Sequence, residues 1–330
     1  MDVIETQKDR TDLPLVVMPS VIASMVKPFT DLLGLLHDVA RVRMWTDSTL
    51  DADEIVRRCE GADAVAVLGF HVTDALYVRL RDHVRCFAFG GTGVASYIDM
   101  QRAKRDGIAV CNVVRYGDHA VAEHAMALVL ELARHAGALD QDVRAGHWRG
   151  RDGISLHGRT LGLVGFGGIG QAMASIAAGF GMEILAWNSH LHADAVKRYD
   201  VRPVDSIRDL FASSDVVSLH LPLLDSTRGV VTAKDLDALR PGTLFVNTAR
   251  AEIIEEGALT RRLSRGDVPA GLDVFEREPL PKDDPLLRIP GVVVTPHVAW
   301  RTDEAFRGLT EQVIRSMSSF LAGGRFNRVI

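Results

Sequence analysis

The sequence predicts an α/β protein with two domains, each built on a parallel sheet covered by helices. Short apolar runs alternate with longer amphipathic segments, a pattern typical of parallel sheets with helices on both faces. Several runs, such as VVMP, LGLVGF and GVVVTP, are continuously apolar, as in strands buried on both sides. The length of 330 residues exceeds one typical core, so two domains are expected.

Ten of the apolar runs are expected to be strands. In chain order they are Leu15–Met18, Ala64–Leu68, Cys86–Phe89, Val110–Val113, Thr160–Val164, Glu183–Trp187, Val216–Leu221, Thr243–Thr248, Ala270–Val274 and Val292–Thr295. Helix-like stretches lie between most of them, which predicts parallel pairing through helical crossovers.

Two long helices are expected, at about Asp118–Ala136 and at Asp303–Leu321. The first contains the stretch HAVAEHAMALVLELARHAG, which is too long and apolar for a surface helix of one domain. Because the two helices flank a central block, we expect the chain to cross twice between domains. Residues 118–300 then form one domain, and residues 1–117 with 301–330 form the other.

Composition excludes several classes of function. The formal net charge of −5 offers no electrostatic footprint for nucleic acid or an anionic membrane surface. No apolar run approaches the roughly 18 residues that span a bilayer, and the polar N-terminus lacks the apolar region of a secretory signal. The three cysteines form no CxxC pair, which argues against structural zinc or a disulfide framework. We therefore expect a cytoplasmic protein that binds no metal.

A glycine-rich turn stands between an expected strand and an expected helix. Residues 160–170 read TLGLVGFGGIG, so Gly165, Gly167 and Gly170 form GxGxxG, with Gly168 and Ile169 completing the turn. The first glycine allows a tight turn, the second lets the backbone approach a pyrophosphate, and the third lets helix and strand pack closely. The helix N-terminus offers free N–H groups to phosphates. Residues 118–300 are therefore expected to bind a dinucleotide; the alternative is a turn without a ligand.

The residue that contacts the adenosine ribose is expected about 20 residues further on. That position is Asn188, in AWNSH, followed by Ser189. An acid there would repel a 2′-phosphate, whereas Asn188 binds ribose without that repulsion. No arginine follows at once to hold a phosphate. NAD is therefore favoured as the cofactor, with NADP as the alternative.

Three segments after the glycine-rich turn carry polar residues just beyond expected strands. They place Arg250 in VNTARAEII, Asp273 and Glu278 in AGLDVFEREPLP, and His297 in VVVTPHVAW. The carboxyl ends of parallel strands share one edge, which is also the edge where a dinucleotide binds. We therefore expect these side chains to converge, with Thr248 and Ala249 contacting the cofactor.

The residue types fit the reduction of a 2-oxo acid. The guanidinium of Arg250 can hold a carboxylate and a carbonyl oxygen. Hydride transfer to the carbonyl carbon creates an alkoxide, and His297 can protonate it or take the proton back in reverse. A carboxylate beside the histidine favours the imidazolium and fixes its orientation. Glu278 is expected in that role, with Glu276 as the competing acid.

Each of these residues also has a structural interpretation. Arg250 is alternatively a surface ion-pair partner, Glu278 a cap for the turn before Pro279, and His297 an ordinary loop histidine. Asp273 is expected to orient the nicotinamide carboxamide, the alternative being a turn-forming aspartate. Trp300 either shapes the substrate pocket or packs. The remaining histidines, including His124 and His220, are expected to be structural.

Taken together, these motifs resemble the D-isomer-specific 2-hydroxyacid dehydrogenases. The resemblance rests on LGLVGFGGIG, VVSLHLPLLDSTRG, LRPGTLFVNTAR, AGLDVFEREPLP and VTPHVAW, and on GIAVCNV and AVAEHAMALVLELAR before them. It covers nearly all of the chain after residue 60. It implies two Rossmann-like or flavodoxin-like domains, an active site in the cleft between them, and a homodimer formed mainly through the cofactor domains. Residues 1–117 with 301–330 would then bind the substrate.

The resemblance also implies roles for single residues. The arginine of TAR binds substrate, the histidine of TPH is the acid/base and the second acid of ExEP pairs with it, which matches Arg250, His297 and Glu278. The loop Gly91–Thr92–Gly93 matches the loop whose N–H groups receive the substrate carboxylate. Tyr116 matches a substrate-contacting tyrosine and Pro222 a ribose-side cofactor loop.

This chain departs from the family pattern at several positions. Ala251 replaces the usual glycine after the arginine, Asn188 replaces the usual ribose-binding acid, and GTGVASYID carries one extra residue. The substrate therefore stays open among glyoxylate, hydroxypyruvate, pyruvate, phosphohydroxypyruvate and bulkier 2-oxo acids. Two alternatives to the enzyme are kept: a cofactor-sensing, corepressor-like binding protein and a phosphite dehydrogenase of the same fold.

Overall fold

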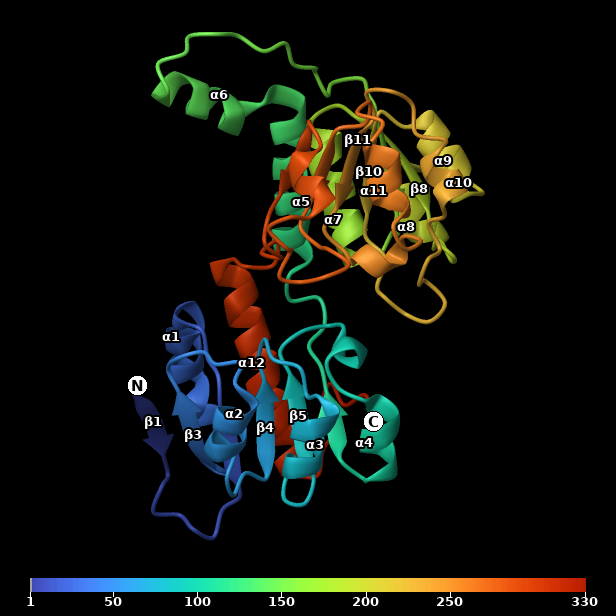
Figure 1. The fold of residues 1–330 in the computed structure, drawn as a ribbon. Helices are drawn as coiled ribbons and strands as arrows, with labels where there is room; N and C mark the ends of the chain where they lie inside the picture. Colours follow the sequence, from blue (N-terminus) through green and yellow to red (C-terminus); the bar gives the residue numbers. More distant parts are fainter. Residues whose placement is uncertain (1) are drawn as a thin grey trace. The chain divides into compact units, whose positions relative to one another are not determined.

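The computed structural model describes residues 2–330, which form two compact units (Figure 1). The first comprises the chain up to Tyr116 together with Thr302–Ile330, and the second is Gly117–Arg301. Gly117 and Arg301 thus lie in the second unit, whereas the sequence placed them in the first. No helix within residues 2–330 combines the length and apolar character needed to cross a membrane.

The first unit contains a six-stranded sheet in the order β1-β3-β2-β4-β5-β6. Its strands are β1 (Val3–Thr6), β2 (Leu15–Met18), β3 (Arg41–Trp45), β4 (Ala64–Val67), β5 (Cys86–Phe89) and β6 (Ala109–Cys111). The strands β2 to β6 pair in parallel, but β1 pairs antiparallel with β3 at the edge. The expected parallel pairing is thus found for β2 to β6, and the polar N-terminal segment adds a half-exposed antiparallel edge strand that was not expected.

Helices cover this sheet. They are α1 (Ala23–Leu32), α2 (Ala52–Arg58), α3 (Asp74–Leu80), α4 (Met100–Arg105) and α12 (Asp303–Leu321), with short 3₁₀ turns at Leu33–Leu36 and Val94–Ser96. The expected helix Asp303–Leu321 is confirmed. It begins at a Thr302 cap whose side chain accepts from the Ala305 N–H, and it packs against α1 and β5.

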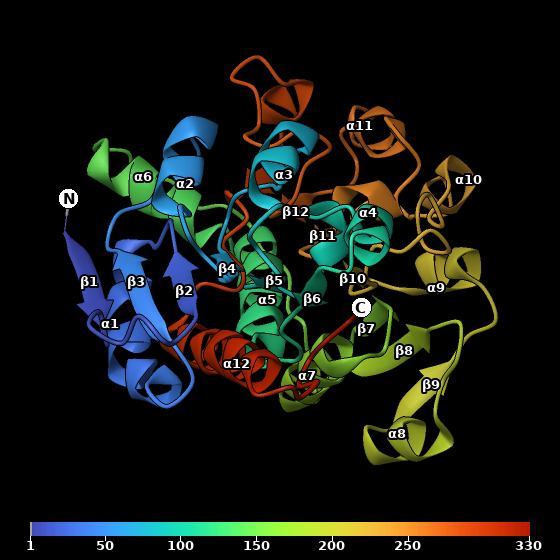
Figure 2. The same cartoon turned by 90° about the horizontal axis from the view of Figure 1, so that it is seen from below.

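The second unit contains a seven-stranded sheet that is parallel throughout, in the order β13-β12-β11-β10-β7-β8-β9. Its strands are β7 (Thr160–Val164), β8 (Glu183–Trp187), β9 (Val201–Pro203), β10 (Val216–Leu219), β11 (Leu244–Asn247), β12 (Ala270–Leu272) and β13 (Val292–Val294). The chain runs outward from β7 through β8 to β9 (Figure 2), then returns to the other side of β7. Such a reversal of strand order creates a ligand crevice at the carboxyl ends of the two central strands.

Helices lie on both faces of this second sheet. They are α5 (Asp118–Arg134), α6 (Ala136–Arg144), α7 (Gly168–Gly179), α8 (Ala193–Arg198), α9 (Ile207–Ser213), α10 (Ala233–Leu236) and α11 (Ala258–Leu263), with 3₁₀ turns at Ala251–Ile253 and Pro285–Arg288. One apolar core joins the sheet to α5 and α7, and a second joins it to α9, α10 and α11. This doubly covered parallel sheet confirms the expected fold class.

Several element bounds differ from the expectation. The helix expected at Asp118–Ala136 ends at Arg134, because His135 takes a left-handed conformation (φ 56°) before α6 begins. All ten expected strands are present, but six differ at their ends, and β1, β3 and β9 were not foreseen. Thr248, Asp273 and Thr295 lie just beyond β11, β12 and β13 rather than within the sheet ladder. These residues belong to the candidate site.

Candidate functional site

The glycine-rich turn after β7 has the geometry of a phosphate-binding loop. Gly165 has a φ of +100°, and a β-carbon there would lie 2.7 Å from the carbonyl carbon of His220. A β-carbon at Gly170 would collide with the carbonyl oxygen of Gly165. By contrast, no atom lies within 4 Å of the β-carbon position of Gly167, which caps α7. The backbone at Gly167 is therefore open to a bound group at the start of a helix.

Two buried polar side chains just beyond the carboxyl ends of β10 and β11 have no hydrogen-bond partner among residues 2–330. They are the imidazole of His220, at both ring nitrogens, and the hydroxyl of Thr248. His220 follows β10 and Thr248 follows β11, which are adjacent strands. Burial lowers the pKa of His220 to about 4, so its ring is neutral near pH 7 and can both donate and accept. Unpaired buried polar groups are costly, so their presence at the crevice fits a polar ligand such as a dinucleotide.

The expected adenosine-side residues lie in exposed loops of the second unit. The Asn188 side chain follows β8 and donates through Nδ2 to the His190 carbonyl oxygen at 2.6 Å. Ser189 is exposed beside it, and the carbonyl oxygen of Pro222 accepts from the Thr227 hydroxyl at 2.6 Å. The carboxamide of Asn188 thus shapes its own loop and carries no charge.

His297 and Glu278 form a close pair. His297 Nδ1 lies 2.7 Å from Glu278 Oε2, while Glu278 Oε1 accepts from the Phe275 N–H at 3.0 Å. Burial would raise the pKa of Glu278, but the hydrogen bond and charge of His297, the Phe275 N–H and the charge of Arg250 together lower it. Glu278 is therefore a carboxylate near pH 7, and His297 must donate to it from Nδ1. Nε2 is left to exchange a proton.

The competing acid has a different partner. Glu276 Oε1 accepts from the Gly257 N–H at 2.7 Å, so Glu276 holds the start of α11. Glu278 has both of the expected contacts, since Oε1 caps the turn at the Phe275 N–H and Oε2 binds His297.

Arg250 is held by its neighbours in the loop after β11. Its Nη1 donates to the Ala249 carbonyl oxygen at 2.7 Å. The buried Asn247 side chain donates to the Arg250 carbonyl oxygen at 3.1 Å and accepts from the Ala249 N–H at 3.0 Å. Asn247 was not among the expected site residues, although its position directly before TAR at a strand end was visible in the sequence. The charge of Arg250 contributes to the lowered pKa of Glu278, so the guanidinium lies within electrostatic reach of that carboxylate.

Asp273 binds the loop that carries His297. Its fully buried carboxylate accepts from the Thr295 hydroxyl at 2.5 Å and from the Val298 and Ala299 N–H groups at 2.9 Å each. His124 Nε2 lies 3.0 Å from the Thr295 hydroxyl oxygen. Neither Thr295 nor His124 was expected in the site. The sequence did contain an indication for His124, because it lies one helical turn from the apolar residues Ala120 and Leu128. Both are buried, so His124 is on the face of the helix that packs inward.

The loop expected to receive a carboxylate lies in the first unit, after β5. Carbonyl oxygens of this loop already accept hydrogen bonds. The Gly91 oxygen accepts from the Val113 N–H at 3.1 Å, and the Thr92 oxygen accepts from the Asn112 side chain at 3.0 Å. Within residues 2–330 no acceptor is found for the N–H groups of Gly91, Thr92 and Gly93. A loop whose carbonyl oxygens are occupied and whose N–H groups are available suits the binding of an anion.

The other two expected substrate residues lie where each unit ends. Tyr116 is the last residue of the first unit's N-terminal segment, and its β-carbon would lie 3.6 Å from one built on Gly308 of α12. Trp300 lies in the second unit, where its β-carbon is 3.8 Å from the β-carbon position of Gly117 and the Arg301 guanidinium stands 5.9 Å from its ring centre. Both therefore have packing contacts within their own units.

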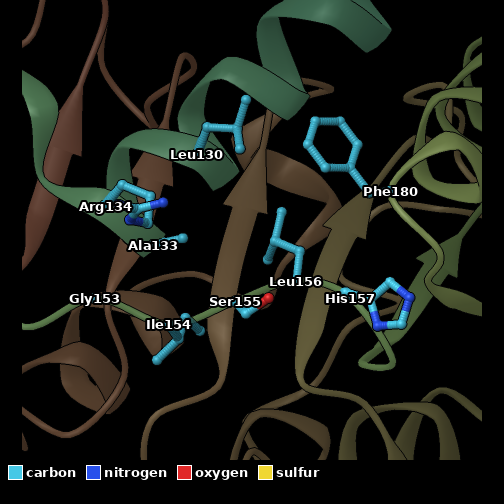
Figure 3. Close-up of a pocket in the computed structure, with 9 residues that line it drawn as sticks. All are labelled: Leu130, Ala133, Arg134, Gly153, Ile154, Ser155, Leu156, His157 and Phe180. Carbon is cyan, nitrogen blue, oxygen red and sulfur yellow. The ribbon is translucent and has the colours of Figure 1, made fainter.

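The second unit also contains a cavity of about 450 Å³ (Figure 3), and none of the candidate site residues lines it. It is lined by Leu130, Ala133, Arg134, Gly153, Ile154, Ser155, Leu156, His157 and Phe180. The segment 153–157 precedes β7, so the cavity is at the amino end of that strand. The candidate chemical residues all follow carboxyl ends, and we therefore assign the site to those ends.

Comparison with known proteins decides the family. Residues 126–299 match the model described as the D-isomer specific 2-hydroxyacid dehydrogenase, NAD binding domain. A glyoxylate reductase from Korarchaeum cryptofilum is 34% identical over 299 residues, covering 88% of this chain and 90% of that protein. The chain belongs to the D-isomer-specific 2-hydroxyacid dehydrogenases.

Other members of the family are similarly close. A hydroxypyruvate reductase from Thermotoga maritima is 36% identical over 280 residues, covering 82% of this chain and 89% of that protein. The structure of apo D-lactate dehydrogenase from Escherichia coli matches with a TM-score of 0.83 at 27% identity, over 96% of this chain and all of that one. This dehydrogenase therefore uses a nicotinamide cofactor to interconvert a 2-oxo acid and a D-2-hydroxy acid.

Proposed function

We propose that this dehydrogenase reduces a small 2-oxo acid, with Arg250 holding the substrate and the His297–Glu278 pair exchanging the proton. The observation that carries the proposal is the 2.7 Å contact between His297 Nδ1 and Glu278 Oε2. It orients the imidazole so that Nε2 is the atom available to a substrate oxygen. Relatives named glyoxylate reductase and hydroxypyruvate reductase support glyoxylate and hydroxypyruvate as the first substrates to try.

The residues perform separate parts of the reaction. When bound, the reduced nicotinamide supplies the hydride that reaches the carbonyl carbon of the substrate. The Arg250 guanidinium holds the substrate carboxylate and polarises the carbonyl oxygen. His297 Nε2 gives its proton to the oxygen as negative charge develops there, which completes the alcohol. The Glu278 carboxylate stabilises the imidazolium before that transfer, and in the oxidative direction it stabilises the imidazolium that forms.

The carboxylate of the substrate is also proposed to meet the Gly91–Thr92–Gly93 loop. Its three N–H groups without acceptors within residues 2–330 support this role. Tyr116 and Trp300 are proposed as further substrate contacts, on the strength of the family resemblance.

The proposal is tested by following the oxidation of NADH and, separately, NADPH against a panel of 2-oxo acids. We expect turnover with at least one of them, and we expect His297→Asn to reduce it by about 10²–10⁴-fold while cofactor affinity is retained. Cofactor binding without any turnover would contradict the proposal and favour a cofactor-sensing binding protein or oxidation of phosphite. Normal turnover by His297→Asn would contradict the assignment of the acid/base.

We propose NAD as the preferred cofactor, bound by residues of the second unit. The phosphates would meet Gly165, Gly167, Gly168, Ile169 and Gly170; the adenosine ribose would meet Asn188, Ser189 and Pro222; and the nicotinamide half would meet Thr248, Ala249 and Asp273. Asn188 supplies no cation for a 2′-phosphate, which supports NAD. Calorimetric dissociation constants for NADH and NADPH decide the preference, and tighter NADPH binding would contradict it.

We also propose that the chain forms a homodimer through the segment between Arg134 and Gly153. The two ends of this segment are neighbours in the second unit, because the Ile154 N–H donates to the Ala133 carbonyl oxygen at 3.0 Å. Its helix α6 stands out from the unit (Figure 1) and contains no buried residue. The side chain of Trp148 is 91% exposed. A nine-residue helix without packing is marginal alone, so a second copy would supply the missing contacts.

Sedimentation velocity tests the dimer. The wild-type chain is expected to sediment as a dimer at micromolar concentration, and Trp148→Asp is expected to weaken the association. Leu50→Ser, at a position 76% exposed in the first unit, is the matched control and should leave association unchanged. A monomeric wild-type protein would contradict the proposal.

A cytoplasmic setting is proposed for this enzyme. The three cysteines, Cys59, Cys86 and Cys111, are free and buried, which suits a reducing compartment.

A further inference from the structure

The loop that carries His297 has a strained backbone and a single carboxylate that holds it. His297 has a φ of +54°, a left-handed conformation that residues other than glycine adopt at a cost. Asp273 binds both sides of it, through the Thr295 hydroxyl before His297 and through the N–H groups of Val298 and Ala299 after it. Asp273 thus holds the position of the imidazole without touching it.

The direction of each hydrogen bond in this network can be deduced. Both oxygens of Asp273 accept backbone N–H groups, so the carboxylate is an acceptor and the Thr295 hydroxyl must donate to it. The Thr295 oxygen then has only lone pairs to offer His124. The 3.0 Å contact therefore runs from His124 Nε2–H to Thr295, and onward from Thr295 to Asp273. This direction requires that His124 carry its proton on Nε2.

His124 belongs to the most extensively packed helix of the second unit. Helix α5 contacts α7, β11 and β12, and eight of its residues are buried. The His124 side chain is 25% exposed and approaches Asp273 Oδ1 to 3.7 Å. The chain of hydrogen bonds therefore connects a rigid helix to a loop that is 171 residues away in sequence.

We propose that His124, acting through Thr295 and Asp273, is a positioning residue for His297. The Nε2–H of His124 donates to the Thr295 oxygen and so holds in place the hydroxyl that donates to Asp273. Asp273 then holds the strained loop so that His297 Nδ1 meets Glu278. Loss of His124 or of the Thr295 hydroxyl leaves the loop free to relax from the left-handed conformation. This inference rests on the proposed acid/base role of His297.

Thr295→Val and Thr295→Ser form a matched pair, because the first removes the hydroxyl at nearly constant volume and the second retains it. His124→Leu is matched by His119→Leu, an exposed histidine on the same helix. The readouts are kcat and KM with hydroxypyruvate or glyoxylate, the NADH dissociation constant, and the low-field NMR signal of the His297 Nδ1 proton. The last readout needs no turnover.

We expect Thr295→Val and His124→Leu to lower kcat by about 10²-fold and to broaden or shift the Nδ1 proton signal, because small displacements of a catalytic group are costly. The NADH dissociation constant is measured beside them because Asp273 is also proposed to meet the nicotinamide, and both control variants should match the wild type. Unchanged kcat and an unchanged proton signal in Thr295→Val would overturn the proposal. So would an equal loss of kcat in Thr295→Ser, since that variant keeps the hydroxyl.

Failure of the proposed function has a different outcome. If His297→Asn retains wild-type turnover, the acid/base assignment is wrong and the positioning role falls with it. If His297→Asn is inactive while Thr295→Val and His124→Leu are fully active, only the positioning role is wrong.

Discussion

The carboxylate of Glu278 accepts from His297 Nδ1 at 2.7 Å and from the Phe275 N–H at 3.0 Å, so one side chain joins His297 to the turn at Phe275. The charge of Arg250 reaches the same carboxylate and contributes to its lowered pKa. The three groups therefore act as a coupled set, and each can be perturbed separately.

Replacing Glu278 with Gln should lower the rate of reduction at neutral pH by about 10²-fold, because the imidazolium loses its counter-charge. Rates of NADH oxidation at neutral pH measure this effect. Glu276→Gln is the control, since Glu276 binds the Gly257 N–H instead, and an equal effect there would contradict the assignment.

Replacing Arg250 with Lys should lower kcat/KM for the 2-oxo acid by about 10²-fold, because an ammonium cannot reproduce the forked geometry of a guanidinium. The NADH dissociation constant should change little. Steady-state kinetics and fluorescence titration with NADH separate the two. Exposed Arg277→Lys serves as control, and a loss confined to NADH affinity in Arg250→Lys would count against substrate binding by Arg250.

Replacing Asn188 with Asp should weaken NADPH binding by at least about 10-fold relative to NADH, because a carboxylate repels a 2′-phosphate. The substitution also removes the hydrogen bond from Asn188 Nδ2 to the His190 carbonyl oxygen. Asn188→Ala removes the same bond without adding charge, so it isolates the electrostatic effect. Dissociation constants from calorimetry provide the measurement; equal weakening of both cofactors by Asp would place the ribose elsewhere.

Acid should destabilise the folded protein through His220. Burial lowers the pKa of His220 from about 6.5 to about 4, so between these values the unfolded chain binds a proton that the folded chain does not. Stability is therefore lost as pH falls from about 6.5 towards 4, by about 2 kcal/mol at roughly pH 5. Urea unfolding of the wild type and of His220→Asn at about pH 7 and pH 5 tests this. Equal losses in the two proteins would show that the folded imidazole takes up protons freely.

Local patterns were sufficient to predict the parallel sheets, the glycine-rich turn and the positions of Arg250, Glu278 and His297 beyond the ends of strands. Each depends on residues close in sequence, such as the strand–turn–helix around Gly165. The His124–Thr295 contact joins residues 171 apart, and no local pattern specifies which helix residue faces which loop. Likewise, the sequence does not show which of the two glutamates pairs with His297. In the folded protein Glu276 binds the Gly257 N–H and Glu278 binds His297.

The strand β1 was missed for a related reason. Its residues VIET are half exposed at an edge, so they lack the apolar run that marks a buried strand. The left-handed residue His135 was missed because a histidine gives little warning of a positive φ, whereas a glycine would have indicated the end of α5.

The first unit is assembled from two distant parts of the chain, which has a consequence for the order of folding during synthesis. Helix α12 packs on α1 and β5, and Gln312 exchanges two hydrogen bonds with the backbone of Val114, 198 residues earlier. The second unit is continuous and emerges from the ribosome ahead of α12. The domain that begins first must therefore finish last, and until then its sheet exposes the apolar surface that α12 covers, where a chaperone can bind.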